Sequence, residues 1–480
     1  MDHPVSELRA TAWQKLQDSI IYFQGEPVGT VAALDPHVEA LNYDQCFIRD
    51  FISAALVFLA QGETQIVRNF LLQTLRLQIK EKQLDFLEPG RGLMPASFKV
   101  VHRIPSLDQP PAEDQAAATA TTTAAEVEEE LQADFGDHAI GRVTPVDSCL
   151  WWLFLLRAYV KATQDFGFCH TPECQKGIRL IMELCLSARF DMYPTLLVPD
   201  GACMIDRRMG INGHPLEIQS LFYMALRAAQ ELLLPNQANE KTHQAVVNRL
   251  KPLADHLRQH YWLDLDRLNV IYRYKGEEYG ENVLNQFNIY PESVPYSQLG
   301  EWLPQEGGYF VGNLGPSQLD CRFFSLGNLM AILTGLATPD QAQKILNVIE
   351  VKWSDLVGYM PMKICFPALK GRDWEVLTGC DPKNRPWSYH NGGNWPVLMW
   401  LLVASAQVGQ RSVLGQWALE AAGPRLMKDD WPEYYDGKNG RLIGKEARKL
   451  QAWTLSGFLL AHTYQEHPEL VDWISFEPLS

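Results

Sequence analysis

The stretch "CLWWLFLLRAYV", residues 149–160, is apolar on nearly every side when it is read as a helix. A helix of this kind is buried on most of its faces, because a surface helix keeps a polar stripe. Amphipathic segments such as "TQIVRNFLLQTLRLQIKEKQ" (64–83) alternate with stretches of the buried type. The other buried stretches are "SLFYMALRAA" (220–229), "FFSLGNLMAILTGLA" (323–337), "NWPVLMWLLVASA" (394–406) and "WTLSGFLLAH" (453–462). The alternation predicts an inner and an outer layer of helices.

Apolar periodicity predicts twelve helices in all. They fall near residues 7–22, 44–60, 62–82, 146–164, 172–188, 215–233, 239–260, 320–336, 338–350, 392–407, 409–421 and 446–464. Short connectors such as "QGE" (61–63) favour antiparallel helix pairs. Six pairs close a ring if the first helix completes the last pair, so we expect one all-α domain over 1–480, an (α/α)6 barrel. An open α-solenoid is the alternative, but its fixed repeat period is missing.

One segment does not fit the barrel. Residues 109–133, "QPPAEDQAAATATTTAAEVEEELQA", are rich in Pro, Ala, Thr and acidic residues and have no apolar face until their end. Such a composition does not supply enough apolar surface to pack. We expect a disordered, low-complexity surface insertion that can be removed without loss of activity.

The charge and the cysteine content indicate which classes of partner and which cellular compartment are compatible with the sequence. The net charge is −15 and Lys and Arg form no block, which argues against nucleic acid because phosphate binding needs clustered cations. Nine cysteines without a CxxC pair indicate reduced thiols. No signal peptide is recognisable, and no apolar run reaches the roughly 18 residues of a membrane span. We expect a soluble cytoplasmic protein with no membrane partner.

A polar cluster precedes or begins each inner helix. Because the inner helices run in one direction, all six clusters should meet at one end of the barrel and line a bowl. The clusters are "NYDQCFIRD" (42–50), "GRVTPVDS" (141–148), "NGHPLEIQ" (212–219), "PSQLDCR" (316–322), "SYHNGGN" (388–394) and "GKEARKLQ" (444–451).

Several kinds of chemistry lack their motif. HExxH is absent and the twelve histidines are scattered, so we expect no metal and no other cofactor. GxxxxGK[ST] and GxSxG are also absent. Carboxylates in unusual surroundings remain: Glu433 in "WPEYYDG" (431–437), Asp50 beside Arg49, and Asp147 before a helix, where an aspartate commonly just caps the helix.

Two carboxylates across an aromatic, polar bowl suit glycoside hydrolysis. One protonates the leaving oxygen, and the other activates water or attacks the sugar carbon. Aromatic rings stack on the apolar faces of sugars. Composition leaves open which two carboxylates act and on which sugar.

Six longer motifs resemble the alkaline/neutral invertases, glycoside hydrolase family 100. They are "LNYDQCFIRDF" (41–51), "DFGDHAIGRVTPVDSCLWW" (134–152), "CMIDRRMGINGHPLEIQSLF" (203–222), "YMPMKICFPAL" (359–369), "WSYHNGGNWPVLMWLL" (387–402) and "WPEYYDGKNGRLIGKEARKLQAWT" (431–454). The likeness runs from about residue 40 to 465, and the insertion lies outside all six motifs.

The resemblance implies an (α/α)6 barrel that converts sucrose to glucose and fructose by a metal-free, inverting mechanism, and it suggests a homo-oligomer, a hexamer. It makes Asp206 of "IDRR" the general acid and Glu433 the general base. An inverting pair has its carboxyl groups about 6.5–9.5 Å apart. Arg207 and Arg208 follow the proposed acid, and a guanidinium within about 4 Å would lower its pKa and weaken the assignment.

Further residues are predicted to contact the substrate. Those implied by the resemblance are Arg49, Asp50, His390, Asn394 and Trp395; those chosen for their place at inner-helix starts are Asp147, Gln219, Gln451 and Trp453.

Other functions stay open at this point. The alternatives among enzymes are another (α/α)6 glycosidase, such as a glucoamylase- or trehalase-like hydrolase, or a disaccharide phosphorylase. A catalytically silent sugar-binding protein is the alternative outside enzymes, although such proteins usually lose a catalytic carboxylate. A terpenoid-cyclase-like toroid is disfavoured because neither DDxxD nor DxDD occurs.

Overall fold

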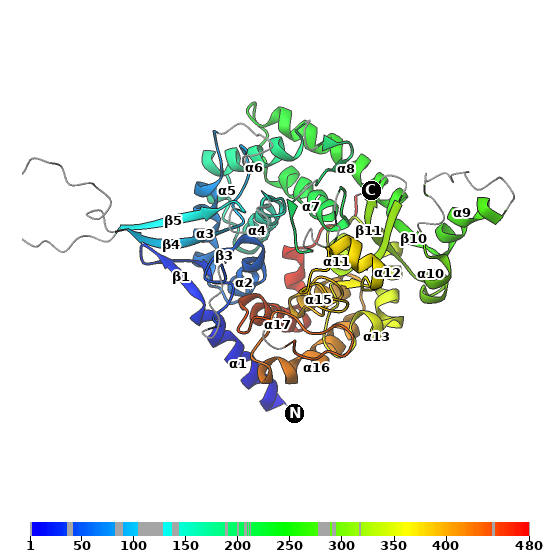
Figure 1. Cartoon of the computed structure of the whole chain (residues 1–480). Coiled ribbons are helices and arrows are strands. Elements are labelled where there is room, and N and C mark those ends of the chain that lie inside the picture. Colours follow the sequence, from blue (N-terminus) through cyan, green and yellow to red (C-terminus); the bar gives the residue numbers. More distant parts are fainter. Residues whose placement is uncertain are drawn as a thin grey trace, which may run out of the picture.

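The computed structural model of the chain is a ring of helices in two layers (Figure 1). It describes residues 2–35, 42–81, 90–103, 128–136, 144–187, 191–198, 201–205, 209, 211, 213–276, 289, 294–315, 318–443 and 447–479. Everything stated below about the structure concerns these residues.

Six helices form the inner layer, and each packs against the next along the chain. The last one, α17, also packs against α2 and thereby closes the ring (Figure 1). The inner helices are α2 (Ile48–Ala60), α4 (Ser148–Thr163), α7 (Leu216–Leu232), α11 (Ser325–Leu333), α15 (Met399–Val408) and α17 (Ala452–Glu466). Every residue of α4 from Ser148 to Val160 is buried, so the apolar stretch 149–160 is a core helix as predicted.

Six helices form the outer layer: α1 (Asp2–Asp18), α3 (Thr64–Leu77), α6 (Pro172–Cys185), α8 (Glu240–His260), α12 (Pro339–Val351) and α16 (Ser412–Lys428). Their sequences divide by face. In α3, Ile66, Val67, Phe70 and Leu71 are buried while Gln65 is exposed, the spacing of an amphipathic helix. α1 packs against α17 and completes the sixth pair. The predicted (α/α)6 barrel is therefore confirmed, with all twelve predicted helices present.

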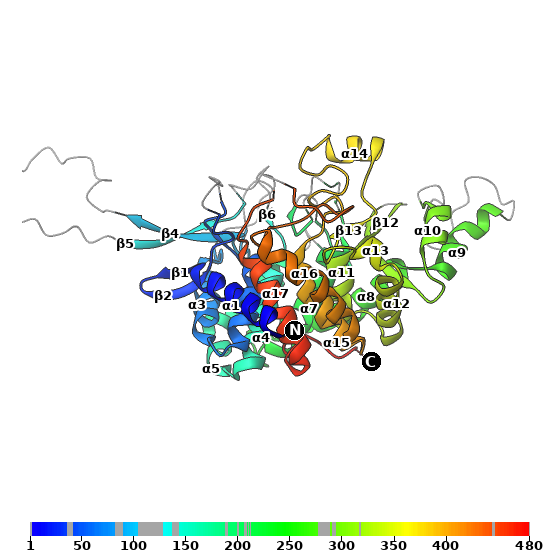
Figure 2. The same ribbon diagram turned by 90° about the horizontal axis from the view of Figure 1, so that it is seen from below.

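Short helices and strands fill the connections. The extra helices are α5 (Phe166–Cys169), α9 (Leu265–Gly276), α10 (Tyr296–Trp302), α13 (Trp353–Leu356), α14 (Gly371–Thr378), η3 (Pro396–Leu398) and η5 (Pro468–Trp473). The strands are β1 (Ile20–Phe23), β2 (Glu26–Thr30), β3 (Cys46–Phe47), β4 (Ser97–Arg103), β5 (Glu128–Asp134), β6 (Thr144–Pro145), β7 (Asp191–Met192), β8 (Thr195–Leu196), β9 (Gly201–Ala202), β10 (Trp262–Asp264), β11 (Gly308–Gly315), β12 (Gln318–Phe324) and β13 (Cys365–Phe366). Figure 2 shows β6, β13 and α14 at one end of the barrel and α5 at the other.

Three predicted helices begin five or more residues later than expected: α11, α15, which starts at Met399 and not near residue 392, and α17. The segment 320–336 starts as strand β12, and α11 begins only at Ser325. Phe323 and Phe324 pair with Phe366 and Cys365 in a sheet of order β10-β11-β12-β13, and a short apolar run fits a strand as well as a helix. The segment 446–464 becomes helical only at Ala452.

The predicted insertion is described only at its end. Residues 128–133 belong to β5, which pairs antiparallel with β4 from Ser97↔Asp134 to Arg103↔Glu128. The expectation of disorder is wrong for these six residues, because their backbone is paired and alternate side chains are partly buried. The rest of the segment, up to residue 127, lies outside the described residues.

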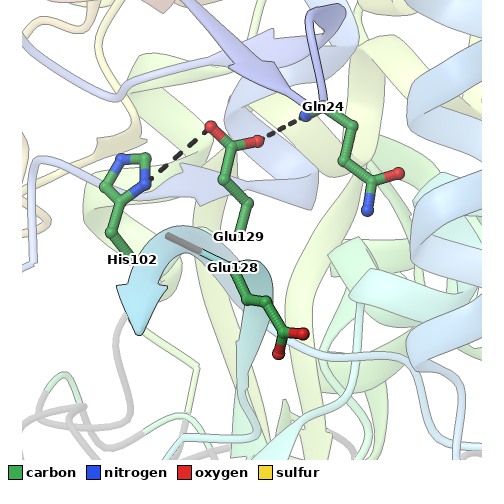
Figure 3. A pocket seen from close by; sticks show the side chains of 4 residues that line it. All are labelled: Gln24, His102, Glu128 and Glu129. Carbon is green, nitrogen blue, oxygen red and sulfur yellow. Dashed lines mark hydrogen bonds and ion pairs between the residues drawn. The ribbon is translucent and has the colours of Figure 1, made fainter. Parts of the chain in front are cut away.

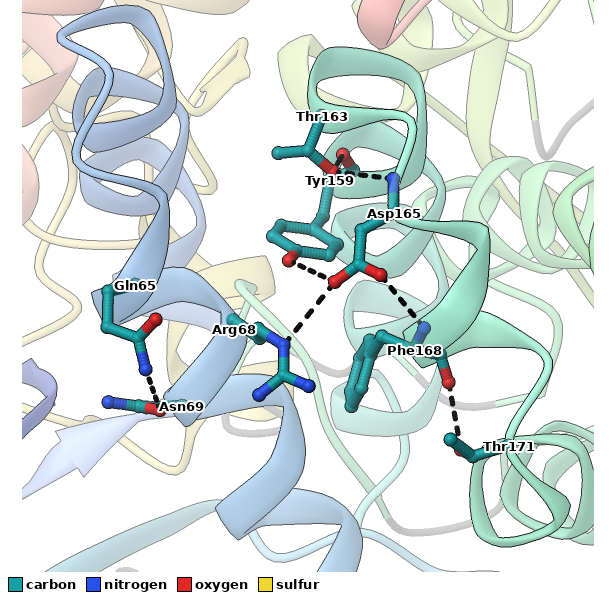
Figure 4. A network of polar contacts seen from close by, with 8 residues as sticks. All are labelled: Gln65, Arg68, Asn69, Tyr159, Thr163, Asp165, Phe168 and Thr171. Carbon is teal, nitrogen blue, oxygen red and sulfur yellow. Dashed lines mark hydrogen bonds and ion pairs between the residues drawn. The ribbon is translucent and has the colours of Figure 1, made fainter.

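A polar network holds α3, α4 and α5 together near the carboxyl end of α4 (Figure 4). Asp165 accepts hydrogen bonds from the Phe168 backbone N–H at 2.9 Å, the Tyr159 hydroxyl at 2.8 Å and Arg68 Nε at 3.3 Å. The Asp165 carboxylate thus caps α5 and ties it to both neighbours. This network lies where an inner helix ends, so the bowl is built elsewhere, from inner-helix starts.

Candidate active site

One arginine and three carboxylates meet where three inner helices begin. Arg49 and Asp50 lie in the first turn of α2, Asp147 directly precedes α4, and Glu217 lies in the first turn of α7. Arg49 Nη1 donates to Asp147 Oδ2 at 2.6 Å, and Arg49 Nε lies 3.9 Å from Asp50 Oδ1. Within the described part of the chain, the Asp147 side chain makes no capping bond to α4. Its carboxylate therefore serves Arg49 and not the helix end.

Burial dominates the titration of this cluster. It raises the pKa of Asp50 to about 7; Arg49 opposes the shift, while Glu433 and Asp147 add to it. It also raises the pKa of Glu217 to about 7, with a further contribution from Asp147. Burial lowers the pKa of Arg49, but Asp147, Asp50 and Glu217 together raise it above its ordinary value. The site thus holds one permanent cation, Arg49, beside two carboxyl groups whose pKa values are raised, Asp50 and Glu217.

Glu433 lies in the loop between α16 and α17 and is 4 % exposed. Its backbone N–H donates to the Arg448 carbonyl at 2.7 Å, which fixes the loop, and the Tyr43 hydroxyl donates to its Oε1 at 3.0 Å. Its Oε2 is buried and has no hydrogen-bond partner in the described residues. Burial raises the pKa of Glu433, against the opposing effects of Lys383, Tyr43 and Arg448. One oxygen is held and the other is free to accept a proton.

Aromatic rings form a continuous wall beside this carboxylate, in which each ring contacts the next. The His390 ring stacks on Tyr389 at 3.8 Å and on Trp395 at 5.0 Å between centroids. Trp395 also stacks on Tyr434 at 5.6 Å and meets Trp453 edge-on at 5.4 Å. Tyr434 directly follows Glu433, so the wall and the carboxylate share one loop. The structure therefore brings the predicted residues His390, Trp395 and Trp453 together.

Two predicted amides present unused polar atoms. Asn394 pairs with Tyr435 through both backbone groups, at 2.9 and 2.8 Å, and its buried Oδ1 has no partner in the described chain. Gln451 donates its backbone N–H to Trp431 at 3.0 Å, and its buried Nε2 is likewise unpaired within that part of the chain. Buried polar atoms normally find a partner. A bound hydroxyl-rich molecule is a natural partner for both.

Gln219 is placed differently from the prediction. Its Oε1 accepts the Leu196 backbone N–H at 2.9 Å, and its Nε2 donates to the Leu196 carbonyl at 2.8 Å. The side chain is fully buried. Gln219 therefore acts as an extra strand partner for β8, and its amide does not face the bowl.

The predicted acid, Asp206, lies outside the described residues, as do Arg207 and Arg208. The two residues before it are described: Met204 and Ile205 are buried, 4 % and 2 % exposed. The carboxyl separation and the distance from Asp206 to the nearest arginine therefore stay predictions.

A small cavity of about 30 Å³ lies between the inner helices. Its lining includes Arg49, Trp151, Trp400 and Trp453. That volume holds about one water molecule. Among the described residues, the inner helices are thus closely packed at this level.

A second cavity, of about 800 Å³, lies beside two β-hairpins (Figure 3). It is lined by Gln24, His102, Glu128 and Glu129, at the β1–β2 turn and the β4–β5 hairpin. Glu129 accepts the Gln24 backbone N–H at 2.5 Å and lies 3.8 Å from His102. These contacts hold the two hairpins together, and none of the described residues that line this cavity is a predicted site residue.

The described residues contain neither a metal-binding cluster nor a membrane-spanning helix. No group of three or more His, Cys, Asp or Glu side chains there is arranged to hold a metal ion. None of the described helices is both long enough and apolar enough to cross a membrane.

Two residues of the site, Tyr43 and Glu217, were not singled out from the sequence. Both lie in the polar clusters at inner-helix starts, 42–50 and 212–219. Membership of those clusters was the available signal, but which cluster residues point inward depends on the tertiary packing.

Comparison with known proteins points to one family. A family described as "Alkaline and neutral invertase" matches residues 12–468. Cytosolic invertase 1 of Oryza sativa subsp. japonica is 50 % identical over 99 % of this chain and 80 % of its own length. Neutral/alkaline invertase 1, mitochondrial, of the same organism is 54 % identical over 96 % of this chain and 71 % of its own.

Solved structures share the fold at low sequence identity. The GH63 mannosylglycerate hydrolase from Thermus thermophilus, in complex with glucose, superimposes with a TM-score of 0.52 at 11 % identity. The match covers 94 % of this chain and 99 % of that one. At such low identity the likeness concerns the fold alone.

Proposed function

Since the chain belongs to the alkaline and neutral invertase family, we propose that it hydrolyses sucrose to glucose and fructose by an inverting, metal-free acid–base mechanism. The observation that carries the mechanism is Glu433. It is a buried glutamate with Oε1 held by Tyr43 at 3.0 Å and Oε2 without a partner in the described residues. That arrangement suits a general base, because the free oxygen can accept a proton from water.

In this mechanism the glucosyl ring enters first and rests against the aromatic wall. Arg49 and Asp50 bind its hydroxyls, Asp147 orients Arg49, and the free Asn394 and Gln451 atoms supply further hydrogen bonds. Asp206 gives its proton to the bridging oxygen as the bond from glucosyl C1 to that oxygen breaks. Glu433 takes a proton from the water whose oxygen bonds to C1 from the opposite face. The products are β-glucose and fructose.

The test is proton NMR of sucrose hydrolysis with wild-type protein, E433Q and D206N. We expect β-glucose as the first anomer, and a loss of roughly 10²–10⁴-fold in kcat for each variant, as a positioned acid or base supplies. E350Q, on the outer helix α12, is the matched control and should behave as wild type. First release of α-glucose, or an active E433Q, would overturn the mechanism.

The same assay separates the remaining alternatives. Hydrolysis of trehalose or maltose in preference to sucrose would indicate another barrel glycosidase, and dependence on phosphate would indicate a phosphorylase. No turnover of any disaccharide, with sugar binding retained, would indicate a sugar-binding protein.

We also propose the cytosol as the compartment and a homo-oligomer as the assembly. All nine cysteines are free thiols, as in a reducing compartment, although relatives named for the cytosol and for mitochondria both exist. Cell fractionation and light scattering in solution test the two statements. A monomer would refute the hexamer that the family resemblance implies.

A further inference from the structure

Glu217 is a buried carboxyl group that the mechanism above does not use. It is 1 % exposed and lies in the first turn of α7. Its Oε1 accepts the backbone N–H of Met204 at 2.7 Å, and its Oε2 accepts that of Ile205 at 3.3 Å. Two consecutive peptide groups are thus held by one carboxylate, one by each oxygen.

A further hydrogen bond holds the carbonyl group of Ile205. The Cys203 thiol donates to the Ile205 carbonyl at 3.0 Å, so this short segment is fastened at both of its amides and at its last carbonyl. Residues 203–205 are all buried. Peptide groups held in this way have little freedom to rotate, so α7 fixes the backbone of Met204 and Ile205. The next residue in the sequence is Asp206.

Burying a carboxylate is costly unless it makes strong hydrogen bonds. A glutamine of the same size could accept through one oxygen only, and its NH2 group would face a second N–H donor. A glutamate at position 217 can accept both N–H groups, one with each carboxylate oxygen. Burial raises the pKa of Glu217, Asp147 repels its carboxylate and raises that pKa further, and Arg49 attracts the carboxylate and lowers that pKa.

We propose that Glu217 is a positioning residue for the general acid: it holds the peptide groups of Met204 and Ile205, the two residues that directly precede Asp206 in the sequence. This inference rests on the proposed function, in which Asp206 is the acid. Glu217 itself touches no reacting atom.

The choice of leaving group separates positioning of the acid from support of the fold. With sucrose, the C1–O bond breaks and the bridging oxygen must receive a proton from the acid. With α-glucosyl fluoride, the C1–F bond breaks and fluoride departs with the bonding electron pair, without needing a proton. Both substrates need Glu433 to take a proton from the attacking water. A misplaced acid therefore slows sucrose and spares the fluoride.

The experiment measures kcat/KM for both substrates with E217Q. We expect a loss of at least about tenfold on sucrose, part of what a positioned acid supplies, and a change within about threefold on the fluoride. D206N should show the same split more strongly, E433Q should lose both activities, and E350Q should keep both. Equal losses on the two substrates, or no loss on sucrose, would overturn the inference.

If E217Q does not accumulate as folded protein, E217D decides by the same ratio. It keeps the charge but draws the carboxylate back by one methylene, so the sucrose loss should again exceed the fluoride loss. Failure of the proposed function looks different. In that case wild-type protein would not cleave sucrose, or D206N would not lose the activity, whatever E217Q does.

Discussion

Replacing Asp50 by asparagine should make the protein more stable and less active. Asp50 is largely buried, with 16 % of its side chain exposed, and burial raises its pKa from 3.8 to about 7. Its neighbour Arg49 has a closer partner in Asp147, at 2.6 Å against 3.9 Å to Asp50. The asparagine would therefore remove an unfavourably buried charge without leaving the guanidinium unpaired.

The size of the effect follows from linkage. An acid whose pKa is higher in the folded than in the unfolded chain binds more protons when folded, so stability falls as pH rises between the two values. Each pKa unit corresponds to about 1.36 kcal/mol. The buried Asp50 charge therefore lowers the free energy of unfolding of the wild-type protein by about 1.5 kcal/mol at pH 5 and by about 4 kcal/mol above pH 7. Asparagine does not titrate, so D50N should gain these amounts.

The assay is urea unfolding followed by tryptophan fluorescence at pH 5 and pH 8. Asp147→Asn is the matched control with the opposite sign, because it breaks the buried Arg49 pair and should cost about 3 kcal/mol or more. Equal gains for D50N at both pH values, or no gain at pH 8, would refute the reasoning. Activity of D50N on sucrose should fall, since Asp50 is proposed to bind the glucosyl ring.

Three further predictions use the same structure. Tyr43→Phe removes a hydrogen bond that lowers the pKa of Glu433, so the acid limb of kcat/KM should move to higher pH; a limb that stays in place would contradict this. Gln219→Leu removes both amide hydrogen bonds to the Leu196 backbone and should cost about 2–4 kcal/mol in urea unfolding with KM unchanged, whereas a large rise in KM would restore Gln219 as a substrate contact. Dialysis against EDTA should leave sucrose hydrolysis unchanged, and a loss restored by a divalent cation would refute the metal-free mechanism.

The barrel could be predicted because the apolar content of each helical stretch indicates how much of that helix is buried. A helical stretch such as 149–160, which is apolar on nearly every face, must be buried on most of its sides, as in the inner layer of a two-layer ring. Strands were harder to find. The β12 sequence "QLDCRFF" (318–324) contains too few residues to separate a strand from the start of a helix, and only pairing with β11 and β13 decides the matter.

The sequence predicted which segments form the site, but not which side chains of those segments point into it. Position at an inner-helix start was the criterion for both Asp147 and Gln219, yet one carboxylate meets Arg49 while the other side chain turns back to Leu196. The direction of a side chain at a helix start depends on the neighbouring helix, which the local sequence does not encode. Tyr43 and Glu217 were not predicted for the same reason: Tyr43 contacts Glu433, 390 positions away, and Glu217 contacts Met204, 13 positions earlier, and neither contact is evident from sequence spacing alone.

The closure of the ring by α17 against α2 has a consequence for biosynthesis. The hydrogen bond from Tyr43 to Glu433 spans 390 positions of the chain, and the Ser53–Ser456 bond between α2 and α17 spans 403. Contacts of such long range form late, because the loop they close must first exist. During synthesis, the apolar faces of α1 and α2 that pack against α17 in the folded protein stay exposed until α17 has left the ribosome. Packing of α17 against α1 and α2 covers these apolar faces, which would otherwise favour aggregation. The same packing brings together the two ends of the chain that carry Tyr43 and Glu433.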